Sequence, residues 1–256
     1  MRKTTFGVIL GALFFAVVGI ALAASQQNTM DYTSTVKYKG KATKKKPKNA
    51  TYNGILTVRN QNGGQPNVST NTEVFFAKQF KQNARKFKSC AKSAFDGKSS
   101  IPKRCNKATV GDGTASATVG QPGQQGQVAG LKVKVINGPK GKRVFLAVNG
   151  PGTGNLWRAI DGPVTKLKGK YGFKINFKVP KDLQQILGSQ IALTDFNVKL
   201  KTKRKVKIKR KRASFLQITK CPASKQLPTK AVTHFQDNSG NAPGQVVVSE
   251  KTMACH

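Results

Sequence analysis

Apolar residues alternate with polar or basic ones at 196–201 and again at 205–209, on the two sides of a basic run. Val206 and Ile208 each stand between lysines, and two further apolar residues before them follow the same rule. A period of two places every second side chain on one face of a β-strand, so one face can be buried while the other meets water. The pattern therefore predicts one hairpin, with a strand on each side of a basic turn at Lys203–Arg204, and not a disordered basic arm.

Similar runs recur through the chain at near-regular spacing. Alternating or β-branched residues occupy 33–40, 50–60, 72–80, 108–120, 127–138, 142–150, 170–180, 190–201, 205–219, 229–237 and 244–252. Asn-Gly and Asp-Gly pairs, which supply the positive φ that tight turns need, lie between or within these runs. These pairs begin at Asn53, Asn62, Asp112, Asn137, Asn149 and Asp161.

Many short strands with turn signals are typical of an all-β, antiparallel β-sandwich. We expect either one sandwich or two packed subdomains that divide near 125–190. Only one segment reads as a helix, a short one near 181–188. Pro180 precedes it, Asp182 falls in its first turn and Gly188 ends it.

The first 24 residues have the composition of a signal peptide. Arg2 and Lys3 precede an uncharged apolar run, and small residues follow at Ala23 and Ala24. We expect cleavage after one of these alanines, which leaves residues 25–256 as a secreted or cell-envelope protein. The alternative is a retained membrane anchor, because the apolar run is about long enough to span a bilayer.

Four cysteines in an exported chain indicate disulfides, and four cysteines allow three pairings. Proximity in the sequence favours Cys90–Cys105 and Cys221–Cys255. The competing interpretation is a metal site. The chain has no C-x-x-C or H-x-x-x-H spacing, and its only histidines are His234 and His256. We therefore predict no metal and no cofactor.

The chain carries 46 basic and 9 acidic residues, a formal net charge of +37. A charge this large repels itself and favours polyanionic partners. The expected partners are anionic cell-wall polymers or lipid head groups, with nucleic acid as a further candidate. The residues predicted to bind them are Lys199, Lys201, Lys203, Arg204, Lys205, Lys207, Lys209, Arg210, Lys211 and Arg212.

Several segments together resemble a group of uncharacterised secreted β-sandwich proteins of actinobacteria. They are "CAKSAFDGKSSIPKRCNKATVGDGTASATVG", "ALTDFNVKL" and "FLQITKCP", followed by a final strand pair that ends in Cys255. The resemblance covers roughly 44–255. Here "CPASKQLPTKAVTHFQDNSG" lacks the tryptophan that the group carries after its CP pair. The resemblance implies the same fold, the two disulfides and secretion, and it implies no catalytic residues.

No catalytic motif stands out in the sequence. G-x-S-x-G, H-E-x-x-H and P-loop patterns are absent, and the nine carboxylates are scattered singly. We therefore predict a non-catalytic structural or binding protein of the envelope or extracellular space, which meets anionic polymers through lysine-rich strands. One alternative is a secreted nucleic-acid-binding protein that stacks bases on Tyr38, Tyr52, Trp157 or Phe173. A hydrolase is the third alternative, since two carboxylates could still meet in space.

Overall fold

Almost all regular structure in the protein is β. The computed structural model describes residues 28–120, 126–150, 153–186, 188–201, 205–208, 211–236 and 244–255. The predicted all-β class is confirmed. The strands are β1 (Asn28–Tyr38), β2 (Lys48–Asn60), β3 (Ser69–Ala77), β4 (Phe80–Gln82), β5 (Thr109–Gly120), β6 (Gly126–Asn137), β7 (Arg143–Asn149), β8 (Arg158–Lys166), β9 (Tyr171–Lys178), β10 (Gln185–Ile186), β11 (Ser189–Leu200), β12 (Val206–Ile208), β13 (Lys211–Ala213), β14 (Leu216–Ile218), β15 (Gln226–Phe235) and β16 (Val246–Ala254).

Fourteen of these strands form one antiparallel sheet. Its order is β16-β15-β3-β9-β8-β7-β6-β5-β11-β2-β14-β4, with β1 paired to β2 and β10 paired to β11. The strands between 126 and 178 join this sheet between β5 and β3, so they do not form a sheet of their own. The two remaining strands, β12 and β13, make a small separate sheet.

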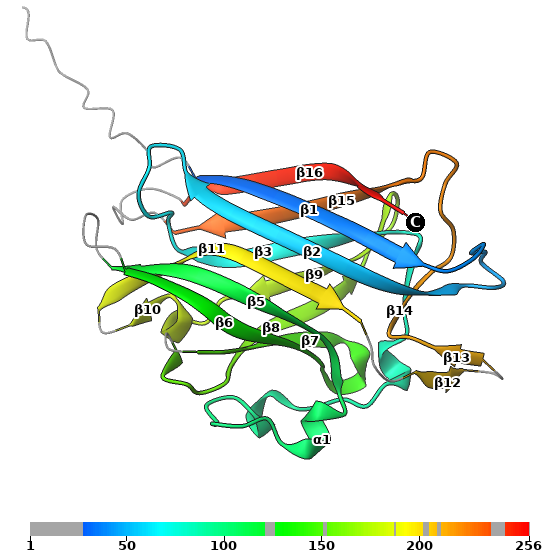
Figure 1. Cartoon of the computed structure of the whole chain (residues 1–256), viewed down its shortest axis with the longest axis horizontal. Helices are drawn as coiled ribbons and strands as arrows, with labels where there is room; N and C mark the ends of the chain where they lie inside the picture. Colours follow the sequence, from blue (N-terminus) through cyan, green and yellow to red (C-terminus); the bar gives the residue numbers. More distant parts are fainter. Residues whose placement is uncertain are drawn as a thin grey trace, which may run out of the picture.

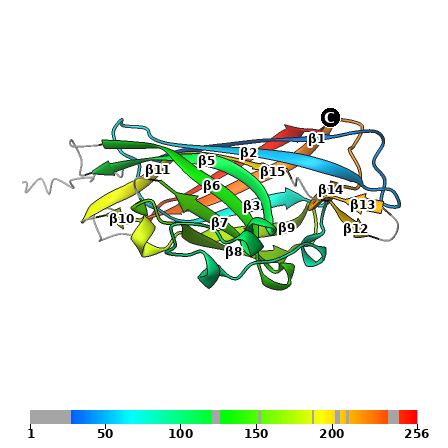
Figure 2. The same cartoon turned by 60° about the horizontal axis from the view of Figure 1, so that its bottom comes forward.

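The large sheet bends back until β1 and β16, the first and last strands of the chain, lie side by side (Figures 1 and 2). The Tyr32 backbone N–H donates to Ser249 Oγ at 3.1 Å, and Val36 forms a parallel bridge with Cys255. Sheets with this many strands twist and curl because an open, flat sheet would leave apolar faces in water. The register of β5 also shifts where it meets β6 and β11, and such bulges bend strands. The two layers of the predicted sandwich are thus opposite walls of one sheet.

The main core lies between these walls. Phe76 and Phe173 stack with ring centroids 4.6 Å apart, and Tyr52 packs against Phe76 at 5.1 Å. Burial of each such side chain stabilises the fold by about 1.5–3 kcal/mol. A second cluster, with Phe95, Phe145 and Trp157, lies outside the sheet under the long connection from β4 to β5.

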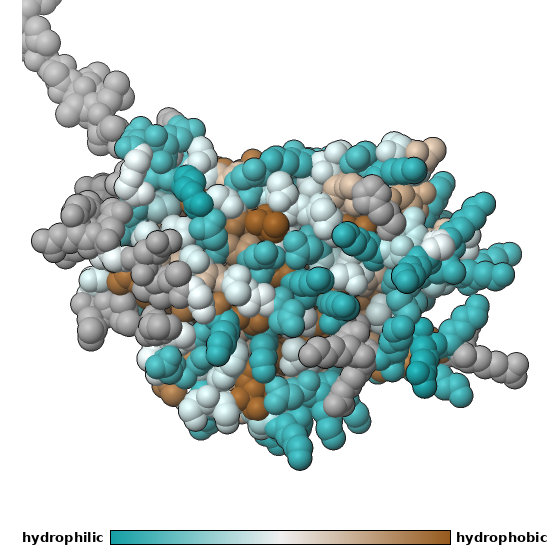
Figure 3. Space-filling view, in the orientation of Figure 1, coloured by the Kyte–Doolittle hydropathy of each residue, from teal (hydrophilic) through white to brown (hydrophobic). Residues whose placement is uncertain are grey.

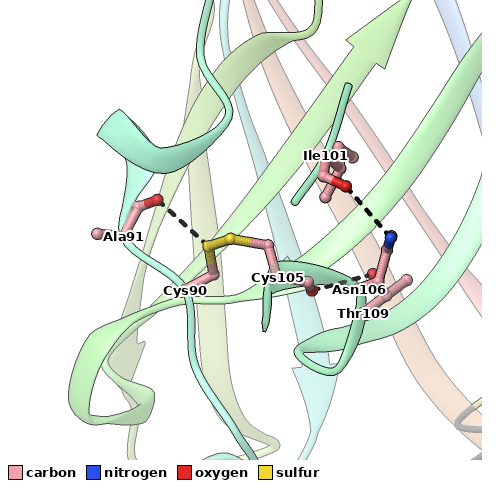
Figure 4. The surroundings of a disulfide bond; sticks show 6 residues. All are labelled: Cys90, Ala91, Ile101, Cys105, Asn106 and Thr109. Carbon is pink, nitrogen blue, oxygen red and sulfur yellow. Dashed lines mark hydrogen bonds between the residues drawn. A yellow bond between two sulfur atoms is a disulfide. The ribbon is translucent and has the colours of Figure 1, made fainter. Parts of the chain in front are cut away.

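Both predicted disulfides are confirmed, as Cys90–Cys105 and Cys221–Cys255. The first lies within the long β4–β5 connection, where it ties Cys90 to Cys105 of the short helix α1 (Lys103–Asn106) in the second cluster (Figure 4). The Asn106 side-chain amide donates to the Ile101 carbonyl at 3.2 Å beside it. Two intact disulfides indicate an oxidising, extracellular type of environment.

The predicted hairpin within 197–212 is wrong in its pairing. β12 pairs with β13, so Val206 lies opposite Ala213, and β12 does not pair with β11. The reason is that both edges of β11 are already occupied, one by β2 and the other by β5. The alternation itself is correct, because Val198 and Leu200 are buried and Lys199 is exposed. The predicted turn at Lys203–Arg204 lies outside the described residues.

The predicted helix near 181–188 is also wrong. Lys181–Leu183 form a single 3-10 turn, and Gln185–Ile186 then pair with Ser189 and Gln190 as β10. An isolated helix this short is marginal in water. Here Lys181, Asp182 and Gln185 are exposed, so the segment has no apolar stripe to pack as a helix.

Three of the six Asn-Gly and Asp-Gly pairs lie inside strands and not at turns. Asp161-Gly162 is central to β8, where Gly162 pairs with Val144. A Cβ at Gly162 would lie 2.5 Å from the Phe177 ring, so this glycine allows close packing and does not form a turn. By contrast, Gly63 has φ +78° in the turn after β2, as the sequence predicted.

The predicted signal peptide, residues 1–24, lies outside the described residues. In the part of the chain that is described, no helix is long and apolar enough to cross a membrane.

Candidate polyanion-binding end and interior cavity

Because the strands are antiparallel, the connections between them alternate between two ends of the sheet. Apart from the long connection 83–108, which runs along the side of the sheet to a bridge between Lys98 and Trp157, one end holds the connections 39–47, 138–142 and 167–170, together with Lys201, Lys205 and the strands β12 and β13. We call this the basic end. None of these segments contains an acidic residue. Their exposed basic residues are Lys39, Lys41, Lys44, Lys45, Lys46, Lys140, Lys142, Lys168, Lys170, Lys201, Lys205, Lys207, Lys211 and Arg212.

The basic end gathers segments that are far apart in the sequence. The Asn49 side chain accepts from the Ser214 backbone N–H at 2.8 Å and donates to the Arg212 carbonyl at 3.2 Å. These bonds hold the β12–β13 hairpin beside the start of β2, next to the three lysines at 44–46. Figure 3 shows long hydrophilic side chains projecting from this side of the molecule, on the right. The three lysines at 44–46 were not among the residues predicted to bind polyanions, although they form a basic run in the sequence.

The acidic residues lie mostly elsewhere and are mostly paired. Of the salt bridges among described residues, only that between Lys170 and Glu250 uses a side chain of the basic end. The other ion pairs, such as Arg59 with Asp195 at 2.9 Å, lie along the strands or in the remaining connections. The positive charge of the basic end is therefore not neutralised within the described protein.

The described connections at the opposite end carry little charge, and we call it the uncharged end. It holds the connections 61–68, 153–157 and 179–184, which are rich in Asn, Gln and Gly. In the described residues of these three connections, Lys181 and Asp182 are the charged side chains. Charge is thus segregated along the strand direction.

The residues predicted to bind polyanions fall into three groups. Lys201, Lys205, Lys207, Lys211 and Arg212 are exposed at the basic end. Lys199 is exposed on β11, but it lies opposite the acidic Asp112 of β5. Lys203, Arg204, Lys209 and Arg210 lie outside the described residues.

The aromatic rings considered for base stacking are largely inside the protein. Tyr52, Phe173 and Trp157 are 3%, 7% and 8% exposed, and Tyr38 is half-buried. Trp157 packs in the second cluster, with Lys134 Nζ 5.4 Å from its ring centroid. These four rings therefore do not form an open stacking surface among the lysines.

The described residues bring together no recognisable catalytic group. No three of their His, Cys, Asp and Glu side chains lie close enough to hold a metal ion. Asp195 pairs with Arg59, and His234 is half-buried in β15 between β3 and β16.

The second feature of the molecule is an apolar cavity between the two walls of the sheet. Its volume, counted as the space open to the centre of a water molecule, is about 170 Å³. The lining is mostly Val, Leu, Ile, Ala and Phe, and no charged residue contributes. Its few polar groups include Ser69, Thr72 and the hydroxyls of Tyr32 and Tyr52. Those two hydroxyls hydrogen-bond to each other, and burial raises the pKa of both.

Comparison with known proteins gives little guidance. No family model matches the chain, and no curated protein does. A solved structure described as "AvmM Catalyzes Macrocyclization in Alchivemycin A Biosynthesis" is similar over 90% of this chain and 89% of that one, with a TM-score of 0.29 and 8% identity. That likeness is too distant to indicate a function. The resemblance to secreted actinobacterial proteins stays a prediction.

Proposed function

We propose that the protein is an exported, non-catalytic binding protein of the cell envelope. Its basic end adsorbs to phosphate-rich anionic polymers of the envelope surface. The observation that supports this proposal is the segregation of charge, with acid-free, lysine-rich connections at one end of the sheet and almost uncharged connections at the other.

Clustered lysines act together when they are closer than the screening length of the solution, about 8 Å at physiological ionic strength. A cluster that lacks acidic partners produces a positive potential of several kT over its surface. Lysine carries its charge on a flexible stem, so it recognises phosphate as a point charge and does not read polymer structure. We therefore expect strong dependence on salt and little selectivity among phosphate polymers.

The nucleic-acid alternative uses the same charges but gains no support from the aromatic rings, because most of them are buried. Export is supported by the predicted signal peptide and by the two disulfides. An envelope polymer is thus the partner class that we favour.

The test is a charge-matched pair of variants. The basic-end variant changes Lys44, Lys45, Lys207 and Lys211 to Gln. The control changes Lys98, Lys132, Lys178 and Lys181 to Gln, which removes the same charge from exposed residues outside the basic end. Both variants should fold, because exposed substitutions usually alter stability by less than about 0.5 kcal/mol each.

Binding is measured to poly(glycerol phosphate) over a range of salt concentrations, with single-stranded DNA and anionic vesicles in parallel. For the basic-end variant, the slope of log affinity against log salt should shrink by roughly 0.7–0.9 for each lost contact. The control should stay close to the parent protein. Equal losses in both variants, or no loss in either, would show that the basic end is not the binding surface.

A further inference from the structure

The interior cavity is too large to be a packing defect. Protein interiors are packed as densely as organic crystals, and few of their voids exceed one water molecule. A water needs about 10–15 Å³ by the same measure, and this cavity offers about 170 Å³. Its lining is too apolar to hold ordered water, which needs two to four polar partners. A cavity of this kind is suited to an apolar ligand.

The lining of the cavity extends far along the strand direction. Five lining residues of β11, from Ile191 to Leu200, follow it along the strand. Nine residue steps of a strand span about 30 Å. Since the lining follows β11 over most of its length, an extended chain can contact more of it than a compact ring system can.

Among the described residues, the lining of the cavity is more exposed toward the uncharged end. Lining residues near that end, including Val119, Leu183 and Ile191, are partly exposed. Lining residues near the basic end, such as Val135 and Phe215, are only 1% and 2% exposed. A ligand can therefore enter from the end that lacks charge.

One polar group marks where the head of such a ligand would lie. Ser69 is the first residue of β3 and lies at the uncharged end. Its hydroxyl lines the cavity and is buried without a hydrogen-bond partner. A buried hydroxyl without a partner is costly, and a carbonyl oxygen from a ligand would satisfy it. A carboxylate fits less well, since no basic residue lines the cavity to pair with it.

We propose that the cavity binds one aliphatic chain of a neutral ester-type lipid. Its carbonyl accepts a hydrogen bond from Ser69, and its methyl end points toward the basic end. This site is separate from the basic end, so either proposal can fail without the other.

The test uses the methyl ester of cis-parinaric acid, a linear chain whose fluorescence rises in apolar surroundings. The purified, disulfide-bonded chain should bind one molecule of this ester. Methyl palmitate should displace it, whereas naphthalene, a compact ring system, should not. Absence of a fluorescence rise, or equal displacement by both competitors, would overturn the proposal.

Two kinds of variant locate the ligand. Ala117→Phe places a ring in the cavity and should abolish binding. Ala115→Leu adds a smaller side chain and should weaken binding, and it serves as the test if Ala117→Phe does not fold. Ser69→Ala should weaken binding of methyl palmitate by about two- to tenfold, the effect of one hydrogen bond. It should leave the affinity for hexadecane unchanged once the weaker binding of the ester probe to the variant is taken into account, because hexadecane has no carbonyl. Unaltered binding in a folded cavity-filling variant would place the probe elsewhere on the protein.

Discussion

Glu250 shows how single residues offset part of the excess positive charge. Its carboxylate accepts a hydrogen bond from Lys170 and another, at 3.2 Å, from the Tyr171 hydroxyl, and Lys230 Nζ lies 3.8 Å away. The bond from Lys170 is the main cause that lowers the pKa of Glu250. Burial, followed by the negative charge of Glu250, raises the pKa of Tyr171 to about 12.

This arrangement predicts a defined pH dependence for Glu250→Gln. The pKa of Glu250 is lower in the folded protein than its ordinary value of 4.5. The carboxylate therefore stabilises the fold when the pH is above 4.5, and this stabilisation is lost as the pH falls through the folded pKa. The substitution should therefore lower the Tm at about pH 6 and have little effect at about pH 2. The pKa of Tyr171, followed by phenolate absorbance, should fall. Asp112→Asn, at an exposed carboxylate, is the control. A Tm difference that persists at about pH 2 would contradict the assignment.

Some features of single residues could be predicted from the sequence and others could not. The cysteine pairing followed from proximity, since each bridge spans only 15 or 34 residues. The role of Gly162 could not be predicted, because that role depends on Phe177, which comes close to Gly162 only after β8 and β9 pair. Local rules identify a turn glycine such as Gly63, but they cannot identify a glycine that makes room for a distant ring.

At the scale of elements, strands were easier to predict than their partners. Alternation marked β11 and β12 correctly, yet β12 could not pair with β11, because β2 and β5 already cover both edges. β8 was missed altogether, since Asp161-Gly162 was interpreted as a turn. Strand identity is local, whereas pairing is decided by which edges remain free in the finished sheet.

The two disulfides support different elements, and the chain's single tryptophan can tell them apart. Trp157 packs in the same cluster as Cys90 and Cys105, outside the sheet. Replacing both of these cysteines by Ser should lower the free energy of unfolding by about 3 kcal/mol and shift Trp157 emission to the red. Replacing Cys221 and Cys255 should cost about 4 kcal/mol and leave the emission of the folded protein unchanged. Denaturant unfolding, followed by fluorescence, measures both effects. A red shift in both variants would mean that the clusters are coupled.

At the scale of the whole molecule, charge and cavity share one axis, and neither arrangement was visible in the sequence. The basic segment 39–47 and the described basic residues of 201–212 are far apart along the chain, and only the strand order places them at one end. The cavity likewise requires β1 to return to β16, a contact made through residues such as Tyr32 and Ser249. Both features come from strand order and curvature, which period-two patterns do not encode.

The shared axis leads to the last prediction. If the basic end rests on an anionic polymer, the mouth of the cavity at the uncharged end faces away from that polymer. Saturating poly(glycerol phosphate) should therefore leave the affinity for cis-parinaric methyl ester within about twofold of its value in free protein. The matched measurement adds methyl palmitate first and then measures the affinity for the polymer. Linkage requires that two ligands affect each other's binding equally, so methyl palmitate should leave the polymer affinity and its salt slope unchanged. The basic-end variant should lose polymer binding and keep the ester. If ester and polymer excluded each other, both would bind at one end of the sheet. The placement of the ester near Leu183 and of the polymer near Lys207, at opposite ends, would then be wrong.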